Sequence, residues 1–396
     1  MTSRSSGIPP GAVRSAFAFS GLFLVNAAAL AWLPVWLESR GLSGEAVGVV
    51  VATIMVARFV FAPAGGYAAD ALGRPRAVLT VTALALVAAF VFFPLAGPLY
   101  VFVAIAFLMG AGLGPSVPIL ESTTVRLAQE GGAAFGPVRA IGTMAFIVGT
   151  LALGGIVGRF GEGAIIVWLI ATGGLWALGT ALLPLPRAAK ERSERRGPRP
   201  GMLRALASRG VLLALLASAL IQGAHAFYYG FGSLAWRDQG LSEATIGALW
   251  AWGAGVEVAL LWYARRFERL GGPLLMAIGA VCALVRWTAM GFAPGLGWLI
   301  GLQMLHAGSF GAAHLGFILY IRDHAPPHAS ATAQAVNSAL TFGGVLAGAT
   351  AVSGVLYEHG GAHGYWSMSL LAGAGLAAAL ALRGLRPPGE PDRAAL

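Results

Sequence analysis

The sequence has little charge and almost no lysine. Charged residues make up 11% of its 396 positions, and Lys190 is the single lysine. A soluble globular domain carries about 25% charged residues, so the composition excludes a water-soluble fold. Cys282 is the single cysteine, which excludes an internal disulfide and a cysteine-rich zinc site.

Motifs for catalysis, nucleotide binding and ion selectivity are also missing. The sequence contains no Walker-type phosphate loop, no zinc-binding helix motif, no serine nucleophile elbow and no selectivity-filter sequence. An ATP-driven pump built from this chain alone is therefore disfavoured. We expect no enzymatic activity, no cofactor and no metal.

What the sequence has instead is apolar length. Hydrophobic residues make up 57% of the chain, the mean hydropathy is +0.76, and 57 glycines allow helices to pack closely in lipid. A spanning helix needs about 20 mostly apolar residues. The sequence therefore predicts an all-α membrane protein with twelve transmembrane helices, at 13–37, 44–69, 77–96, 98–127, 136–158, 163–184, 210–236, 243–264, 273–293, 296–321, 332–357 and 364–384. The first segment is too long for a cleavable signal peptide.

Positive charges fall mainly on one side of these segments. That side carries the linker 185–209 and Arg4, Arg14, Arg74, Arg76, Arg126, Arg265, Arg266, Arg269, Arg322, Arg383, Arg386 and Arg393, and the opposite loops carry only Arg40, Arg159 and Arg237. Because Lys and Arg collect in cytoplasmic loops, we expect both termini in the cytoplasm of a bacterial-type inner (plasma) membrane. The net charge of +10 is then a topology signal, and we expect a surrounding lipid bilayer and no nucleic-acid partner.

The chain repeats a short pattern at half its length. GLSGEAVG at 41–48 and GLSEATIG at 240–247 are offset by 199 residues, and Trp36 and Trp236 precede them. Matching positions in two halves predict two pseudo-symmetric six-helix bundles, 1–184 and 210–396, with a site between them at mid-membrane. The polar, basic stretch 185–209 is the predicted cytoplasmic linker. Chance similarity of two capping loops is the alternative.

Two ionisable residues stand out in the first half. Glu121 and Arg139 lie on consecutive segments, each nine residues from the turn near Glu130, so both lie about 13 Å along their helices and can meet. A charge at the centre of a membrane helix costs about 2.5–3.5 kcal/mol, which makes such residues functional candidates. Two interpretations remain open: a structural ion pair, or a substrate site in which Arg139 binds an anionic or hydroxyl group and Glu121 positions it.

Three ionisable residues stand out in the second half. Glu257, Arg286 and His306 lie near the middle of three successive segments, an arrangement typical of a proton relay. His314 follows His306 on nearly the same helical stripe. Hydrogen-bonded packing is the alternative for each histidine. Protonation of Glu257 would remove a buried charge and release Arg286 to a new partner.

Further residues complete the candidate substrate site. Gln222, His225 and Tyr229 share one predicted helical face with Tyr228 beside it, although an aromatic packing stripe remains possible. Asn26 and Arg58 complete this set, and Arg58 either lines the cavity or extends to the membrane surface. With neutral histidines, the deep arginines and glutamates sum to +1, which favours a monoanion.

A turn between the second and third segments carries a glycine–arginine pattern. Gly66, Asp70, Gly73, Arg74 and Arg76 form G-x-x-x-D-x-x-G-R-x-R. The glycines favour close packing and a tight turn, and Asp70 is placed to bind the arginines or the amides at the start of the next helix. We predict that this motif holds a cytoplasmic gate.

The glycine–arginine motif and the duplicated halves resemble the major facilitator superfamily. The chain more narrowly resembles the phenylpropionate permease family, relatives of the lactose permease-type proton symporters, in VWLESRGLSGEAVG with VARF (35–59), FGPVRAIGTMAFIVGT (135–150), QGAHAFYYGF (222–231), LWAWGAGVEV (249–258), VRWTAMG (285–291) and LHAGSFGAAHLGFILYI (305–321). This resemblance implies the major facilitator fold, with Glu121 and Arg139 as the substrate pair and Glu257, Arg286 and His306 as proton-coupling residues.

The chain departs from that family at two places. The lactose permease group has a second glutamate one turn after the histidine, where this chain has Ser309 and Phe310. Phenylpropionate permease has aspartate where Glu121 stands. The first departure shifts proton acceptance towards Glu257 or a histidine, and the second alters the size of the pocket.

These observations favour a proton-coupled symporter that takes up a small organic anion, such as an aromatic carboxylate, by alternating access. The same fold also fits a nucleoside, a sugar, a peptidoglycan fragment or an exported drug. A membrane sensor that binds without transport is a further class, disfavoured because the predicted tail and linker are short. We expect a small-molecule substrate and protons as partners, and a monomer.

Overall fold

The computed structural model describes residues 10–130, 135–184, 207–325 and 330–385. Throughout these ranges the regular structure is helical. The chain divides into two compact units: unit 1 comprises Met1–Arg195, Ala226–Trp252 and Ala347–Gly361, and unit 2 comprises Arg196–His225, Gly253–Leu346 and Ala362–Leu396. The predicted domains 1–184, 185–209 and 210–396 stay a prediction, and most of the predicted linker lies outside the described residues.

Eleven described stretches are long and apolar enough to cross a membrane. The last, Thr332–Arg383, has 52 residues, which at about 1.5 Å per residue is enough for two crossings of a bilayer core of about 30 Å. It is divided by a 3₁₀ turn, η6 (Gly361–Gly364). The predicted all-α membrane fold with twelve crossing segments is thus confirmed, and the helix ends differ from the predicted ones by a few residues.

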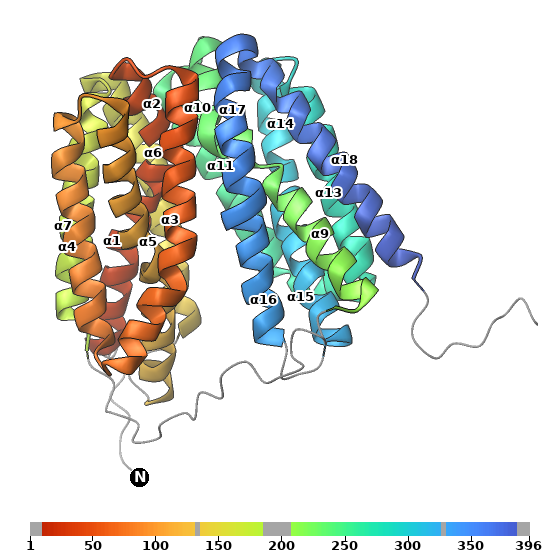
Figure 1. Cartoon of the computed structure of the whole chain (residues 1–396), viewed down its shortest axis with the longest axis horizontal. Coiled ribbons are helices and arrows are strands. Elements are labelled where there is room, and N and C mark those ends of the chain that lie inside the picture. Colours follow the sequence, from red (N-terminus) through yellow and green to blue (C-terminus); the bar gives the residue numbers. More distant parts are fainter. Residues whose placement is uncertain (1–9, 131–134, 185–206, 326–329, 386–396) are drawn as a thin grey trace, which may run out of the picture. The chain divides into compact units, whose positions relative to one another are not determined.

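Unit 1 contains the first six crossing segments and two stretches from the second half of the chain, which hold α10, part of α11 and α17 (Figure 1). Its elements are α1 (Pro10–Ala31), α2 (Leu33–Ser39), α3 (Gly44–Ala71), α4 (Pro75–Phe92), η1 (Phe93–Leu95), α5 (Leu99–Gln129), α6 (Phe135–Phe160), α7 (Gly163–Leu182), α10 (Ala226–Asp238), the first part of α11 (Glu243–Trp262), and α17 (Ala347–Gly360). The second-half pieces therefore pack with the first half as one body.

Glycines set the closest helix contacts of unit 1. A Cβ added to Gly110 of α5 would lie 2.4 Å from the carbonyl oxygen of Ile54, and one added to Gly114 would lie 2.4 Å from that of Arg58. The backbones of α3 and α5 therefore touch over one helical turn, as small residues allow in lipid.

A second set of glycines joins α17 and α11 to the first half. We call the end of unit 1 that holds α2 and the start of α3 the α2 end. There, a Cβ on Gly354 of α17 would lie 2.5 Å from the Gly44 oxygen and 3.1 Å from the Gly48 Cα. A Cβ on Gly247 of α11 would lie 2.4 Å from the Thr150 oxygen. The parts of α17 and α11 that belong to unit 1 thus pack closely against the first half of the chain.

Unit 2 holds most of the second half of the chain. Its elements are α9 (Arg209–Gly223), the rest of α11, α12 (Ala264–Phe267), η2 (Glu268–Leu270), α13 (Gly272–Met290), α14 (Leu296–His306), η3 (Ala307–Ala312), α15 (Ala313–His324), α16 (Ser330–Ser338), η5 (Ala339–Leu346) and α18 (Tyr365–Arg383). A Cβ on Gly272 would lie 2.6 Å from the Gly316 oxygen, so α13 and α15 also pack backbone to backbone.

Several crossing segments are interrupted, which the apolar pattern did not predict. The first is broken at Trp32, before Pro34, a residue that lacks the amide hydrogen needed inside a helix. The seventh is broken between Gly223, where α9 ends, and Ala226, where α10 begins. Two others contain the π-helical stretches η3 and η5. Such stretches occur frequently at functional sites.

Candidate functional site

Glu121 and Arg139 form the predicted pair in unit 1. Arg139 Nε donates to Glu121 Oε1 at 2.7 Å, and Arg139 Nη1 donates to the Thr143 hydroxyl at 3.2 Å. The prediction that the two residues meet across the α5–α6 hairpin is confirmed. The Arg139 guanidinium is thus held by one group on its own helix, the Thr143 hydroxyl, and by one on α5, the Glu121 carboxylate.

Two aromatic rings of α1 lie beneath this guanidinium. The Arg139 Cζ is 4.5 Å from the ring centroid of Phe23 and 5.8 Å from that of Phe19. Gly142 permits this contact, because a Cβ there would meet both rings at 3.2–3.3 Å. Asn26 lies three residues after Phe23 on the same face of α1, and its amide donates to the Leu22 oxygen at 2.8 Å. Cation–π contact favours the charged arginine in this place.

Arg58 lies in the middle of α3 and is half-buried. Within the described part of the chain, its side chain has no hydrogen-bond, ion-pair or aromatic partner. Arg58 therefore differs from Arg139, whose charge is paired with that of Glu121.

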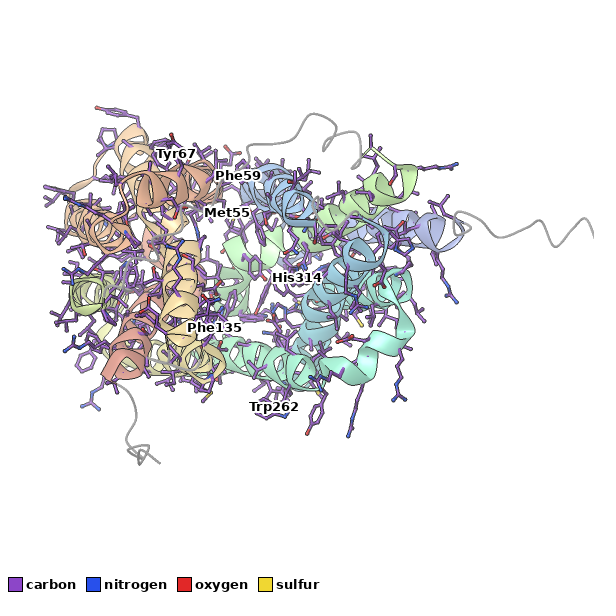
Figure 2. All side chains as sticks on the ribbon, turned by 90° about the horizontal axis from the view of Figure 1, so that it is seen from below. Met55, Phe59, Tyr67, Phe135, Trp262 and His314 are labelled. Carbon is purple, nitrogen blue, oxygen red and sulfur yellow. The ribbon has the colours of Figure 1, made fainter. Side chains whose placement is uncertain are left out.

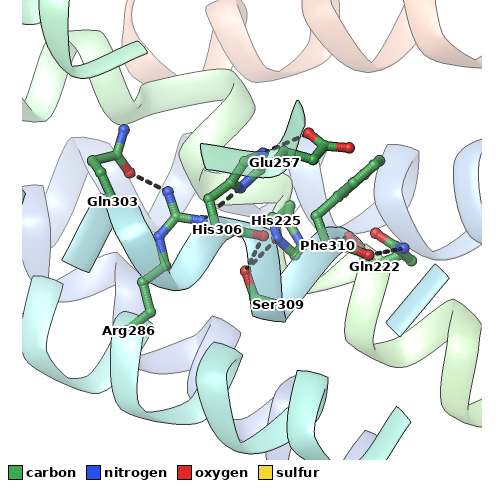
Figure 3. Close-up of polar contacts among 8 residues, drawn as sticks. All are labelled: Gln222, His225, Glu257, Arg286, Gln303, His306, Ser309 and Phe310. Atoms are coloured by element: carbon green, nitrogen blue, oxygen red, sulfur yellow. Dashed lines mark hydrogen bonds and ion pairs between the residues drawn. The ribbon is translucent and has the colours of Figure 1, made fainter. Parts of the chain in front are cut away.

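A chain of polar contacts connects the predicted proton-coupling residues in unit 2 (Figure 3). Arg286 of α13 is fully buried, and its Nη1 lies 2.9 Å from His306 Nδ1. Its Nη2 donates to Gln303 Oε1, and its Cζ lies 4.4 Å from the ring centroid of Trp287. On the other side, His306 Nε2 lies 3.5 Å from Glu257 Oε2 of α11. The structure thus brings the three predicted residues together.

These contacts fix the proton arrangement on His306. Arginine only donates, so Nδ1 of His306 accepts and the proton of the neutral ring lies on Nε2, facing Glu257. A second proton on His306 would displace Arg286 from Nδ1. Among these three residues, Glu257 is thus the one that can take up a proton while the Arg286–His306 contact stays intact.

His225 belongs to the same group of polar contacts as His306, and not to the aromatic residues that follow it in the sequence. Its Nδ1 lies 3.2 Å from the oxygens of Ile221 and Gln222, so this nitrogen carries the proton. Its Nε2 accepts from the Ser309 hydroxyl at 3.1 Å, and its ring centroid lies 5.6 Å from that of His306.

The π-helical stretch η3 supplies the residues that His225 and Gln222 contact. Ser309 and Phe310 belong to it, and the amide of Gln222 donates to the Phe310 oxygen at 3.2 Å. The signal available in the sequence was the pair of small residues Gly308 and Gly311 around them, which is too common in membrane helices to identify such a stretch.

The predicted helical face across Gln222, His225 and Tyr229 is wrong. The break between α9 and α10 separates the first two, which belong to unit 2, from Tyr228 and Tyr229, which belong to unit 1. Tyr228 is fully buried and stacks on Trp250, with ring centroids 4.3 Å apart, and Tyr229 stacks on the same ring at 6.3 Å. These ring contacts fit the alternative of an aromatic packing stripe, and a substrate role for the two tyrosines stays a prediction.

His314 lies beside the polar contacts, where it senses the charge of Glu257. It is exposed on α15, where Figure 2 labels it, and its ring stacks on Phe310 with centroids 6.4 Å apart.

The predicted gate motif lies at the end of unit 1 opposite the α2 end. Asp70 Oδ1 pairs with Arg126 Nη2 of α5 at 3.5 Å. Arg76 Nη1 donates to the Leu183 oxygen at 3.3 Å, beyond the end of α7. Gly73 adopts a φ of +60°, which its position in the tight turn requires. The motif therefore connects α3, α4, α5 and α7.

The other two members of the motif have smaller roles in the structure. A Cβ on Gly66 would meet no described atom within 4 Å, whereas one on Gly65 would lie 2.4 Å from the Pro115 ring. Close packing predicted at Gly66 therefore occurs one residue earlier. Arg74 directly precedes Pro75, the first residue of α4.

The α2 end holds a polar cluster that the sequence reasoning missed. The Tyr357 hydroxyl of α17 lies 3.1 Å from Glu38 Oε1 and 2.8 Å from Asp238 Oδ2. Glu358 accepts from the Gly44 amide. Glu38 and Tyr357 are 319 residues apart, and nothing in the pattern of either segment indicates the other.

An arginine continues this cluster. Arg237 lies 2.5 Å from Glu162 Oε1 and 3.4 Å from Glu243 Oε1, which ties α10 to the start of α7 and the start of α11. We call the residues Glu38, Glu162, Arg237, Asp238, Glu243, Tyr357 and Glu358 the α2-end cluster.

Comparison with known proteins gives a consistent family assignment. The profile described as the MFS_1 like family matches residues 18–368. Over 351 residues the chain is 30% identical to a "Probable 3-phenylpropionic acid transporter" of Escherichia coli (strain K12), covering 85% of this chain and 89% of that protein. Over 349 residues it is 30% identical to maltose permease of Geobacillus stearothermophilus, covering 86% and 85%.

Solved structures share the fold at lower identity. The nucleoside transporter NupG matches with a TM-score of 0.80 and 16% identity, over 94% of this chain and 98% of that chain. A D-xylose-proton symporter matches with a TM-score of 0.67 and 16% identity, over 95% and 98%. At these identities the likeness concerns the architecture alone.

Proposed function

The chain belongs to the MFS_1 like family of major facilitator transporters and is therefore a secondary transporter, and from that premise we propose that it is a proton symporter that takes up a small aromatic carboxylate. The proposal rests on the series of contacts from the partly exposed Glu257 through His306 to the fully buried Arg286. A carboxylate next to a neutral histidine and a fully buried arginine is a proton site whose charge changes helix packing.

The coupling follows from the charges in this chain of contacts. With Glu257 ionised, its charge balances that of Arg286 across the His306 ring. Protonation of Glu257 leaves Arg286 as an uncompensated cation in a buried place, which favours a different arrangement of α11, α13 and α14. Ser309 stands where the resemblance implies a second glutamate, and it binds His225 instead. Glu257 therefore carries the proton.

The substrate class is inferred from unit 1. Arg139 with the rings of Phe19 and Phe23 presents hydrogen-bond donors above an apolar aromatic surface. A flat aromatic body with a polar end group fits such a surface. A relative at 30% identity is named for 3-phenylpropionic acid, which belongs to this class.

Alternating access requires the α2 end to open. Gly354 of α17 and Gly247 of α11 pack closely against the first half of the chain at this end, so these contacts must separate for the end to open. If the basic loops lie in the cytoplasm, with both termini there, the α2 end faces outward and uptake begins when the α2-end cluster separates. One proton moving down 100 mV contributes about 2.3 kcal/mol, enough for roughly fiftyfold accumulation.

A second cargo class is favoured by one observation. The maltose permease relative is also 30% identical, and an acid–arginine pair such as Glu121–Arg139 binds sugar hydroxyls as well as carboxylates. A sugar is therefore the alternative substrate.

Uptake into proteoliposomes tests the proposal. We expect labelled 3-phenylpropionate to accumulate when the outside is made acidic and to equilibrate without accumulation when an uncoupler is added. Accumulation of maltose but not of the carboxylate under the same gradient would establish the alternative cargo. Uptake that ignores the imposed proton gradient would exclude proton coupling.

A further inference from the structure

The deep charges of the described segments do not cancel. Arg139 is balanced by Glu121 at 2.7 Å, and Arg286 shares a contact chain with Glu257. Arg58 remains, and among the described residues it forms no ion pair, hydrogen bond or cation–π contact, so burial is the influence that acts on its charge. The net charge of +1 that the sequence predicts for the deep arginines and glutamates is therefore the charge of Arg58.

Arg58 is too deep to reach the membrane surface. It lies 14 residues after Gly44 and 13 before Ala71, the two ends of α3, which at about 1.5 Å per residue is roughly 20 Å from either end. Arginines that extend to the surface lie near helix ends. The alternative that Arg58 reaches the membrane surface is thus disfavoured.

Arg58 points into the protein rather than into lipid. At about 100° per residue, its side chain lies roughly opposite the midpoint of Val56 and Val60. Those valines are 41% and 50% exposed and form the outer apolar face of α3. The guanidinium therefore projects from the inward face of α3.

The backbone at Arg58 is held rigidly. Gly110 and Gly114 of α5 pack directly on its nitrogen and oxygen. On the adjacent side of α3, Met55 Sδ accepts from the Thr350 hydroxyl of α17 at 3.5 Å, and Figure 2 labels Met55. The guanidinium thus emerges between the α5-facing and α17-facing sides of α3, from a fixed anchor.

We propose that Arg58, and not Arg139, is the residue that binds the charge of the substrate, which makes the substrate a monoanion with a carboxylate or similar group. This inference rests on the proposed transport function and specifies its cargo. The Arg139–Glu121 pair is already neutral and serves hydrogen bonding and ring contact. Only Arg58 gains a counter-charge when the substrate enters. It forms the planar two-point contact that guanidinium makes with a carboxylate.

Paired probes test this assignment. The purified full chain is titrated with 3-phenylpropionate and with its neutral amide, 3-phenylpropanamide, and binding is read from the shift in melting temperature. We expect the wild type to bind the carboxylate roughly 10- to 100-fold more tightly than the amide, the range that a charged hydrogen bond gives. Arg58→Gln should abolish this preference, and Arg58→Lys should retain part of it.

Two further variants separate the roles of the arginines. Arg139→Gln should weaken both probes by a similar factor and keep the preference for the carboxylate. Arg159→Gln, an exposed arginine at the end of α6, should behave as the wild type. A preference that survives in Arg58→Gln but disappears in Arg139→Gln would overturn the assignment, as would a wild type that binds neither probe or binds both equally.

These outcomes are distinct from failure of proton coupling. A preference that depends on Arg58 in a protein whose uptake ignores the proton gradient would keep the anion site and reject the symport. Proton-driven uptake of a neutral compound that Arg58→Gln does not change would support the symport and reject the anion site.

Discussion

Arg139 Nε donates to Glu121 Oε1 across the α5–α6 hairpin, with 31% of the arginine side chain and 35% of the glutamate side chain exposed. A pair sealed between two packed helices would be much less exposed. The exposure leaves donors of Arg139 open to a ligand, which is the observation that separates a substrate site from a purely structural lock.

Replacing Glu121 tests this pair. Glu121→Gln removes the carboxylate that holds the Arg139 guanidinium in place, so we expect counterflow exchange of 3-phenylpropionate to fall at least tenfold, consistent with the loss of a charged hydrogen bond of about 1.5–3 kcal/mol. Glu121→Asp keeps the charge on a shorter side chain and should give an intermediate rate. Glu130→Gln, at the exposed end of α5, is the matched control. Exchange at the wild-type rate in Glu121→Gln would show that the pair is structural.

The Glu121–Arg139 contact could be predicted because it depends only on distances along the sequence. Glu121 and Arg139 are equally far in sequence from Glu130, so on two consecutive crossing helices they lie at the same depth. The same reasoning located Glu257, Arg286 and His306 at a common depth, and the structure places them in contact. The apolar lengths likewise predicted the crossing segments.

Replacing Glu257 separates exchange from accumulation. Glu257→Gln mimics the protonated carboxyl, so we expect counterflow exchange to continue and proton-driven accumulation to be lost. The measurement is labelled-substrate uptake with and without an acid-outside gradient. The control is Glu45→Gln, an exposed acidic residue in the first turn of α3. Accumulation at the wild-type level in Glu257→Gln would move proton coupling to His306 or His225.

Enlarging a glycine should hold the α2 end open. A leucine at Gly354 would collide with the backbone of Gly44 and Gly48, so we expect Gly354→Leu to prevent closure and to abolish transport. Gly348→Leu is the matched control on the same helix, because a Cβ at Gly348 would meet no described atom within 4 Å. The measurement is uptake together with labelling of a cysteine placed at Ala46, which should increase in Gly354→Leu alone. Full transport by this variant would show that the α2 end does not need to close.

The parts that sequence did not predict depend on contacts between distant segments. Tyr357 meets Glu38 from 319 residues away, and each residue by itself has the ordinary features of a helix end. The helix breaks at Ala224 although the apolar stretch of sequence continues through it. At the break, the His225 ring contacts the carbonyl oxygens of Ile221 and Gln222. Apolar periodicity predicts which face of a helix is buried. It does not predict where the helix is broken or contains a π-helical stretch.

The α2-end cluster should make stability depend on pH through Glu38. Glu38 lies beyond the first crossing stretch, Gly11–Ala31. Burial, reinforced by the charges of Asp238 and Glu358, raises the pKa of Glu38 above its ordinary value, and the hydrogen bond from Tyr357 and the charge of Arg237 oppose this only in part. The single Tyr357 proton also cannot serve Glu38 and Asp238 at once, so a protonated Glu38 fits the closed cluster better.

The sign of the effect follows from the raised pKa. A carboxyl whose folded pKa exceeds its unfolded value, about 4.3 for glutamate, stabilises the folded protein fully at acid pH, and this contribution disappears as pH rises through the folded pKa. Glu38→Gln has no such proton to lose. We therefore expect its melting temperature to match or trail the wild type near pH 4, and to gain on it steadily towards pH 8. Glu45→Gln should show no such trend. A difference that is constant or that narrows as pH rises would mean that Glu38 is ionised in the closed cluster.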